Sequence, residues 1–295
     1  MRTIERKPRH AKSGRARAAQ LDDRTHLRQA LMIWFLAYVT AGAAVGVLAG
    51  LLGIGGGMTL VPLLAVTFGA QHFAPDHVVH MALATSMASI IFTSGASVRE
   101  HWKLGGVDIA IVKRIAPGMV VGSLLATVAS AWIPQRTLAL SFAVIVYLGA
   151  TQILLNRKPA AARTLPGPMP LLVIGTGIGI VCGLVSAGGA FLTIPFMLWC
   201  GVPMRTTIGT AGMIGIPVAV VGTIGYLISG WQVPGLPADA LGFVSVTALV
   251  GLVCGSVVTA PYGARLAHRV PVLTIKRVFA CLLYVLATKM LVSYV

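Results

Sequence analysis

Charged residues are rare in this chain, and acidic residues are rarer still. Only 10% of its 295 residues are charged and 57% are hydrophobic, whereas soluble globular domains carry about a quarter charged residues. Six stretches contain no Asp, Glu, Lys or Arg: 31–75, 115–133, 137–155, 169–204, 206–238 and 240–264. Because a spanning helix needs about 20 apolar residues, the composition excludes a soluble domain and predicts an all-α, polytopic membrane protein.

The sequence also lacks the groups that carry most intramembrane chemistry. All seven acidic residues lie in the tail, in loops or at the ends of apolar stretches: Glu5, Asp22, Asp23, Asp76, Glu100, Asp108 and Asp239. A cation carrier is therefore disfavoured, since sodium and proton sites at membrane depth use carboxylates. No HExxH or GxSxG motif occurs, and the four cysteines show no metal-ligand spacing. We expect no catalytic residue, no metal and no cofactor.

Basic residues are present in number, and the formal net charge is +16. Nine of the 23 Lys and Arg residues lie in the first 28 residues, before the first apolar stretch. We interpret residues 1–28 as a basic cytoplasmic tail that sets membrane topology, rather than as a nucleic-acid surface. The next apolar run is too long for a cleaved signal peptide, and the acidic residues of the tail argue against a transit peptide. The expected surroundings are a lipid bilayer, without nucleic acid.

The chain contains an internal repeat. GVLAGLLGIGGGMTLVPLL (46–64) aligns with GIVCGLVSAGGAFLTIPFM (179–197) at an offset of 133 residues. We therefore predict two repeats of about four transmembrane helices each, and each repeat opens with a helix broken at glycines. The predicted units are a first transmembrane repeat at 29–155, a linker at 156–168 and a second transmembrane repeat at 169–295.

Eight spans are predicted, near 31–64, 79–98, 107–132, 135–155, 169–200, 206–229, 240–264 and 271–293. If the tail is cytoplasmic and eight spans alternate, the basic residues Arg99, Lys103, Lys113 and Arg114 fall on the cytoplasmic side as well. However, residues 31–75 would form about 68 Å of continuous helix, against a hydrocarbon core of about 30 Å. If the piece after the break crosses separately, each unit has five segments and the two units are inverted.

The glycine-rich breaks predict a binding site. Irregular backbone at membrane depth is tolerated only where protein or a watery cavity receives its polar groups. Where a helix restarts, its first N–H groups are unpaired and carry partial positive charge, so the break can hold an anion. Candidate substrate-binding residues are Gly53, Gly55, Gly56, Gly57, Thr59, Ser186, Gly188, Gly189 and Thr193, and Pro62 and Pro195 are candidate gating residues. The alternative is close helix packing, which we prefer for Gly46, Gly50, Gly179 and Gly183.

A second matched element follows each break. HMALATSMASI (80–90) aligns with RTTIGTAGMIG (205–215), so that His80 matches Arg205 and Thr85 matches Thr210. A basic side chain at the end of a span could attract an anion, and hydroxyls further along the same helix could then bind it. We therefore add Thr85, Ser86 and Thr210 as substrate-binding candidates, and His80 and Arg205 as gating candidates. Alternatively, the two bases anchor the helices at the interface and the hydroxyls bond to their own helix.

These motifs resemble those of the TauE/SafE family of sulfite and organosulfonate exporters. The resemblance rests on GLLGIGGGMTLVPLL at 50–64, ATS at 84–86 and GLVSAGGAFLTIPF at 183–196. It implies a multi-pass permease of the bacterial inner membrane that moves sulfite, sulfoacetate or related sulfur anions, usually outward. The second motif departs from the glycine pattern, because Ser186 and Ala190 stand where the first has Gly53 and Gly57.

The leading hypothesis is an exporter of small sulfur-containing anions that works by alternating access, with the two halves rocking around residues 53–59 and 186–193. The alternatives are an uptake permease for another small organic anion or sulfur compound, and a membrane scaffold that transports nothing. An enzyme is disfavoured by the missing motifs. The sequence specifies neither a coupling ion nor an oligomeric state.

Overall fold

The computed structural model describes residues 9–52, 56–155, 165–266 and 272–294. Within these ranges eight helices are long and apolar enough to cross a membrane, which confirms the predicted all-helical, polytopic class. Two further apolar helices, α2 and α7, have only 14 and 10 residues. The helices are α1 (Arg9–Leu52), α2 (Gly57–Ala70), α3 (Val78–Lys103), α4 (Ile109–Ala129), α5 (Gln135–Leu155), α6 (Pro168–Val185), α7 (Ala190–Trp199), α8 (Met204–Gly230), α9 (Val246–Leu266) and α10 (Val272–Tyr294), with a 3-10 turn, η1 (Ser130–Trp132), after α4.

The span predicted at 240–264 begins later than expected. Residues 240–245 form a small antiparallel hairpin of β1 (Ala240–Leu241) and β2 (Val244–Ser245), so the prediction of helix there was wrong. The turn contains Gly242 at φ 54°, a conformation that favours glycine. The Asp239 carboxylate accepts hydrogen bonds from the Ser245 hydroxyl at 3.0 Å and the Thr247 N–H at 3.2 Å. These bonds fix the start of α9.

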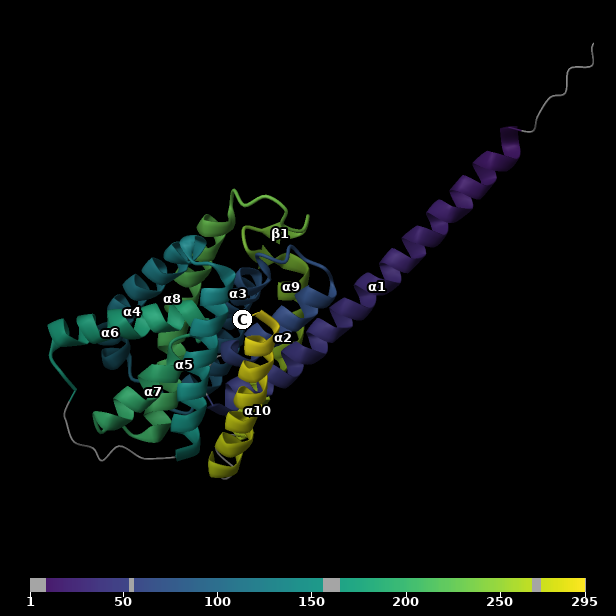
Figure 1. Cartoon of the computed structure of the whole chain (residues 1–295). Helices are drawn as coiled ribbons and strands as arrows, with labels where there is room; N and C mark the ends of the chain where they lie inside the picture. The colour runs from purple at the N-terminus through teal and green to yellow at the C-terminus, as the bar shows by residue number, and fades with distance from the viewer. Residues whose placement is uncertain (1–8, 53–55, 156–164, 267–271, 295) are drawn as a thin grey trace, which may run out of the picture.

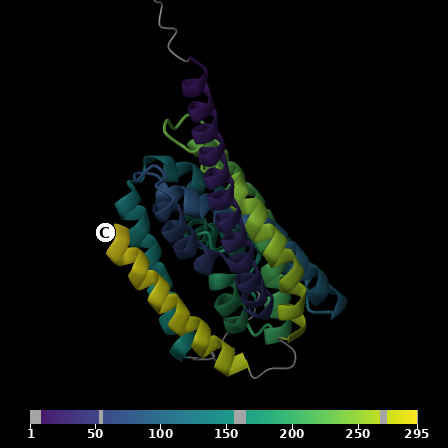
Figure 2. The ribbon, with the colours of Figure 1, turned by 90° about the vertical axis from the view of Figure 1, so that its right-hand side faces the viewer.

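Each half of the chain packs its first helix on the third long helix of the other half. Helix α1 lies along α9, and its N-terminal part extends beyond the bundle (Figures 1 and 2); helix α6 lies along α4. A Cβ atom added to Gly46 would lie 2.7 Å from Cα of Ser256, and one added to Gly179 would lie 2.7 Å from Cα of Met119. Gly50 and Gly183 make similarly close contacts with α9 and α4. The packing role predicted for these four glycines is confirmed.

Two sets of contacts fix the direction of the helices. At one end, the Gln71 amide after α2 hydrogen-bonds the Tyr38 hydroxyl in α1; we call this end, where α1 enters and α3 starts, the tail face. At the other end, Arg265 of α9 donates to Glu100 of α3 at 3.2 Å; we call this end the linker face. Helices α1 and α3 therefore run in the same direction, and α2 returns the chain to the tail face.

The second half runs the opposite way. Val98 of α3 lies beside Gly212 of α8, whereas Met87 lies beside Gly222, so α3 and α8 are antiparallel. Likewise, the Tyr147 hydroxyl of α5 lies 2.6 Å from the Thr288 hydroxyl of α10, and Thr151, further along α5, bonds Tyr284, which is earlier on α10. Helices α5 and α10 are therefore antiparallel. The order of elements in 9–155 thus recurs in 165–294 with every direction reversed, which is the inverted arrangement left open by the sequence.

This path corrects one topological expectation. Arg99 and Lys103 at the end of α3, and Lys113 and Arg114 at the start of α4, belong to the linker face, opposite the end where α1 enters. The prediction that they share a side with the N-terminal tail was wrong. It assumed that the broken segment crosses only once, whereas α2 carries the chain back.

Candidate functional site

The two breaks meet in the interior. A Cβ atom added to Gly57, the first residue of α2, would lie 3.0 Å from the carbonyl carbon of Ser186 and closer still to its oxygen. It would also lie 2.7 Å from Cδ1 of Ile90, which is midway along α3. Helix α2 therefore starts near the middle of the bundle. Ser186 is the residue that follows α6, and it lies three residues before Gly189, the N-cap of α7.

Glycines provide the backbone conformations at both breaks. The N-cap of α2 is Gly56 at φ 77°, and the N-cap of α7 is Gly189 at φ 88°; neither helix has a side-chain cap. Ser186 adopts a left-handed conformation at φ 48°, which is uncommon for a residue with a side chain. The start of α2 therefore lies against Ser186, which ends α6 and comes four residues before α7. The first amide groups of a helix carry partial positive charge, and in α7 the backbone groups of Gly189 and Leu192 hydrogen-bond the Cys182 thiol.

No charged side chain balances these two N-termini among the described buried residues, which include no Asp, Glu, Lys or Arg. Gly56, Gly57 and residues 186–190 are all buried.

Several predicted hydroxyls bond to the breaks themselves. Thr59 donates to the Gly56 carbonyl at 2.7 Å, and Thr193 donates to the Gly189 carbonyl at 2.5 Å, so each closes the first turn of its own helix. The Ser86 hydroxyl of α3 donates to the Gly57 carbonyl at 3.2 Å.

Ser186 continues this connection, since its hydroxyl donates to the Leu83 carbonyl of α3 at 2.7 Å. Helix α3 therefore holds both breaks in position. Gly188 and Gly189 lie with Ser186 in the second break, whereas Gly53 and Gly55 fall outside the described residues.

The matched threonines make equivalent contacts in the two halves. The Thr85 hydroxyl accepts the N–H of Ser245, just before α9, at 3.0 Å. The Thr210 hydroxyl accepts the N–H of Asp108, just before α4, at 2.9 Å. Each threonine therefore joins the second long helix of its half to the start of the third long helix of the other half, as an internal repeat predicts.

The four gating candidates do not form one group. Pro62 lies inside α2 and Pro195 inside α7. Since α3 and α8 are antiparallel, His80 lies at the tail face and Arg205 lies exposed at the linker face. His80 is buried, and its Nε2 is 3.1 Å from the Ser130 carbonyl and 3.2 Å from the Ile133 carbonyl.

Two residues near the second break were missed by the sequence analysis. Tyr226 of α8 is fully buried, and its hydroxyl donates to the Gly183 carbonyl at 3.1 Å and interacts with the Ser186 side chain. Met119 of α4 accepts a bond from the Thr193 hydroxyl at 3.4 Å. The tyrosine was detectable, because a buried tyrosine in a charge-free span requires a partner for its hydroxyl.

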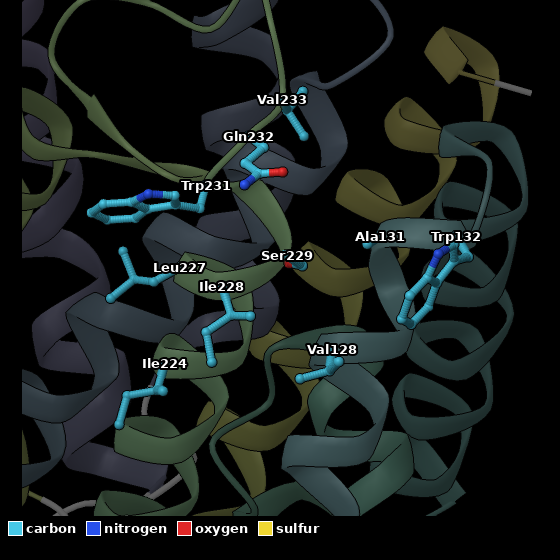
Figure 3. A pocket seen from close by; sticks show the side chains of 10 residues that line it. All are labelled: Val128, Ala131, Trp132, Ile224, Leu227, Ile228, Ser229, Trp231, Gln232 and Val233. Atoms are coloured by element: carbon cyan, nitrogen blue, oxygen red, sulfur yellow. The ribbon is translucent and has the colours of Figure 1, made fainter.

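Two cavities lie at the tail face, apart from the breaks. One, of about 640 Å³, lies between the end of α8 and the end of α4, with Trp231 and Gln232 on one wall and Val128 and Trp132 on the other (Figure 3). The second, of about 530 Å³, also reaches Trp132 and has a mixed lining, in which the polar side chains include His77 and His80.

Known proteins identify the kind of molecule. The chain is 29% identical over 261 residues to a probable membrane transporter protein of Haemophilus influenzae, covering 88% of this chain and 99% of that one. It is 28% identical over 238 residues to the probable membrane transporter protein YdhB of Bacillus subtilis, covering 78% and 89% of the two chains. No solved structure matches the chain. The profile described as sulfite exporter TauE/SafE spans residues 38–290, and the chain therefore belongs to this family of membrane transporters.

Proposed function

We propose that the protein is a permease for small sulfur-containing anions such as sulfite or an organosulfonate, and that it binds the anion where the N-termini of α2 and α7 meet. The observation that carries the proposal is the contact between Gly57 and Ser186, which brings the start of α2 to the second break, four residues before α7 begins, with no Asp, Glu, Lys or Arg among the described buried residues.

Electrostatics favours an anion at this point. A helix N-terminus carries about half a positive charge, and α2 and α7 each begin at a break. A bound anion accepts amide hydrogen bonds, each worth about 1.5–3 kcal/mol when one partner is charged. Glycines at 56, 57, 188 and 189 carry no side chain that would cover the backbone amide groups.

The short helices suggest how the anion reaches both sides. At 1.5 Å per residue, α2 and α7 are about 21 and 15 Å long, close to half of a bilayer core of about 30 Å. Helix α2 leads from the centre to the tail face, and α7 leads from the centre to the linker face. Each therefore lines one half of a path, which suits alternating access.

The moving parts must differ from those predicted by sequence. Rocking of one repeat against the other would separate α1 from α9 and α6 from α4, whose backbones touch at Gly46 and Gly179. We propose instead that each moving body contains helices from both repeats. Export of an anion from an inside-negative cell gains about 2.3 kcal/mol per charge at 100 mV, so it requires no intramembrane carboxylate.

We further propose the bacterial inner membrane as the location, with the basic tail in the cytoplasm, since nine Lys and Arg residues precede the first span. Transport rather than catalysis fits the transporter names of the relatives. A scaffold would move nothing, and an enzyme would release a product instead of moving labelled substrate.

Flux of labelled sulfite into proteoliposomes tests the proposal. Gly56→Leu and Gly189→Leu are expected to abolish flux, because both residues have positive φ and the new side chains would meet Val45 and Met119. Gly177→Leu is the control, since a Cβ atom there meets nothing within 4 Å. Wild-type protein that moves neither sulfite nor an organosulfonate would refute the proposal, as would break variants that bind the anion unchanged.

A further inference from the structure

The second cavity at the tail face contains an unusual pair of histidines. His77 is the N-cap residue of α3, and His80 lies one turn further along, with ring centroids 6.0 Å apart. Both rings contact the ring of Phe243 in the β hairpin, with distances between ring centroids of 5.7 Å for His77 and 5.1 Å for His80. The Nδ1 atoms of both histidines are buried and have no hydrogen-bond partner among the described groups. His80 is only 4% exposed.

The neighbouring carbonyls fix the protonation of one nitrogen of His80. Its Nε2 lies 3.1 and 3.2 Å from two carbonyl oxygens, those of Ser130 and Ile133. Carbonyl oxygens only accept hydrogen bonds, so Nε2 carries its hydrogen in every state. A second proton can therefore bind only at Nδ1, the atom that the protein leaves unpaired.

A proton on Nδ1 creates a buried N–H donor and a positive charge that require a negative partner. The charged and titratable groups around the cavity are Asp76 before α3, Arg136 on α5, Tyr294 on α10 and the neighbouring His77. Asp76 and Arg136 are exposed. Asp239, near the hairpin, is already bonded to Ser245 and Thr247. Among the described residues no hydrogen bond or ion pair joins Asp76 to His80, so a solute anion that enters the cavity can act as the partner of a buried imidazolium.

We propose that this cavity is an entry site in which a small oxyanion binds together with a proton on His80. The proton comes from the solution at the tail face and binds Nδ1, and the oxyanion accepts the resulting N–H. The inference rests on the proposed function for its substrate class. It adds a second site, at the membrane face, and makes occupancy of that site pH-dependent.

Sulfate is a suitable probe, because its charge stays constant where histidine titrates, between about pH 5 and pH 8. The full-length protein is labelled with ¹⁵N-histidine in detergent, and its ring signals are recorded across this range in sulfate and in chloride. His80→Gln identifies the His80 signal, since the amide nitrogen of glutamine can donate to the same carbonyls. The exposed loop residue His72→Asn is the control.

We expect sulfate to move the protonation midpoint of His80 to higher pH and to leave that of His72 unchanged. If protonation is obligatory for binding, the sulfate Kd of the wild type should rise about tenfold per pH unit above the midpoint, and that of His80→Gln should not respond to pH. A His80 signal that titrates identically in sulfate and chloride would overturn the inference.

A second readout does not depend on the His80 variant. Trp132 lines the same cavity and is 78% exposed, so Trp132→Phe should fold normally. Sulfate is expected to change the fluorescence of the wild type at low pH and to have less effect on Trp132→Phe; an identical response would count against the site. If the protein carries sulfite but His80 ignores sulfate, only this inference fails; if His80 responds but no anion crosses, only the proposed function fails.

Discussion

Replacing Gly57 by alanine tests the contact between the two breaks. The new methyl group would lie 2.7 Å from Cδ1 of Ile90 and 3.0 Å from the carbonyl carbon of Ser186, and closer still to the Ser186 oxygen. Normal carbon contacts are about 3.5–4.0 Å, so the breaks must separate by roughly an ångström. Overpacking of this kind costs about 1–3 kcal/mol. Losing one amide bond to the anion would weaken binding about 10- to 100-fold.

The assay is sulfite flux in proteoliposomes, combined with the melting temperature in detergent. Gly57→Ala should reduce flux at least about tenfold and lower the melting temperature. Gly95→Ala on α3 is the matched control, because a Cβ atom there meets nothing within 4 Å and alanine favours a helix by up to about 1 kcal/mol. Equal flux and equal melting for Gly57→Ala and the wild type would refute the reasoning.

Two further predictions concern topology and the crossed contacts. A tag inserted in the linker 156–168 is expected on the opposite side of the membrane from tags at both termini, as labelling of intact and opened vesicles will show; all three on one side would contradict the return of α2. Thr85→Val leaves the buried N–H of Ser245 without its acceptor and should lower the free energy of unfolding by about 1–3 kcal/mol. Thr210→Val should act similarly, whereas Thr40→Val, on an exposed part of α1, should have little effect in the same thermal melts.

Much of the helix arrangement could be predicted from the positions of the glycines in the sequence. Their repetition at a fixed offset predicted two breaks, and the helix-like spacing of Gly46 and Gly50 correctly predicted close packing. Thr85 and Thr210 were matched by sequence, and they make equivalent contacts. These predictions succeeded because glycine and hydroxyl positions are set by close backbone approach, which leaves a direct mark on the sequence.

The direction of the chain after each break could not be predicted from the sequence in the same way. Helix α2 has 14 residues, fewer than a full span needs, yet it changes the side on which every later loop lies. Hydropathy measures length and not the depth at which a helix begins, so it could not show that α2 starts midway along α3. The contacts of His80 were not predictable either. Its position in the sequence predicted a place at the membrane interface, but the two carbonyls that its Nε2 contacts, those of Ser130 and Ile133, belong to a turn about fifty residues later in the chain.

The crossed arrangement of α1 and α9 has a consequence for synthesis. The glycine face of α1 fits a helix that the ribosome makes about two hundred residues later, which takes about 10–40 s at 5–20 residues per second. During that interval the glycine face of α1, which includes Gly42, Gly46 and Gly50, has no α9 to pack against. Insertion and assembly are therefore separate stages for this molecule, and the N-terminal half completes its fold only after its C-terminal counterpart has entered the membrane.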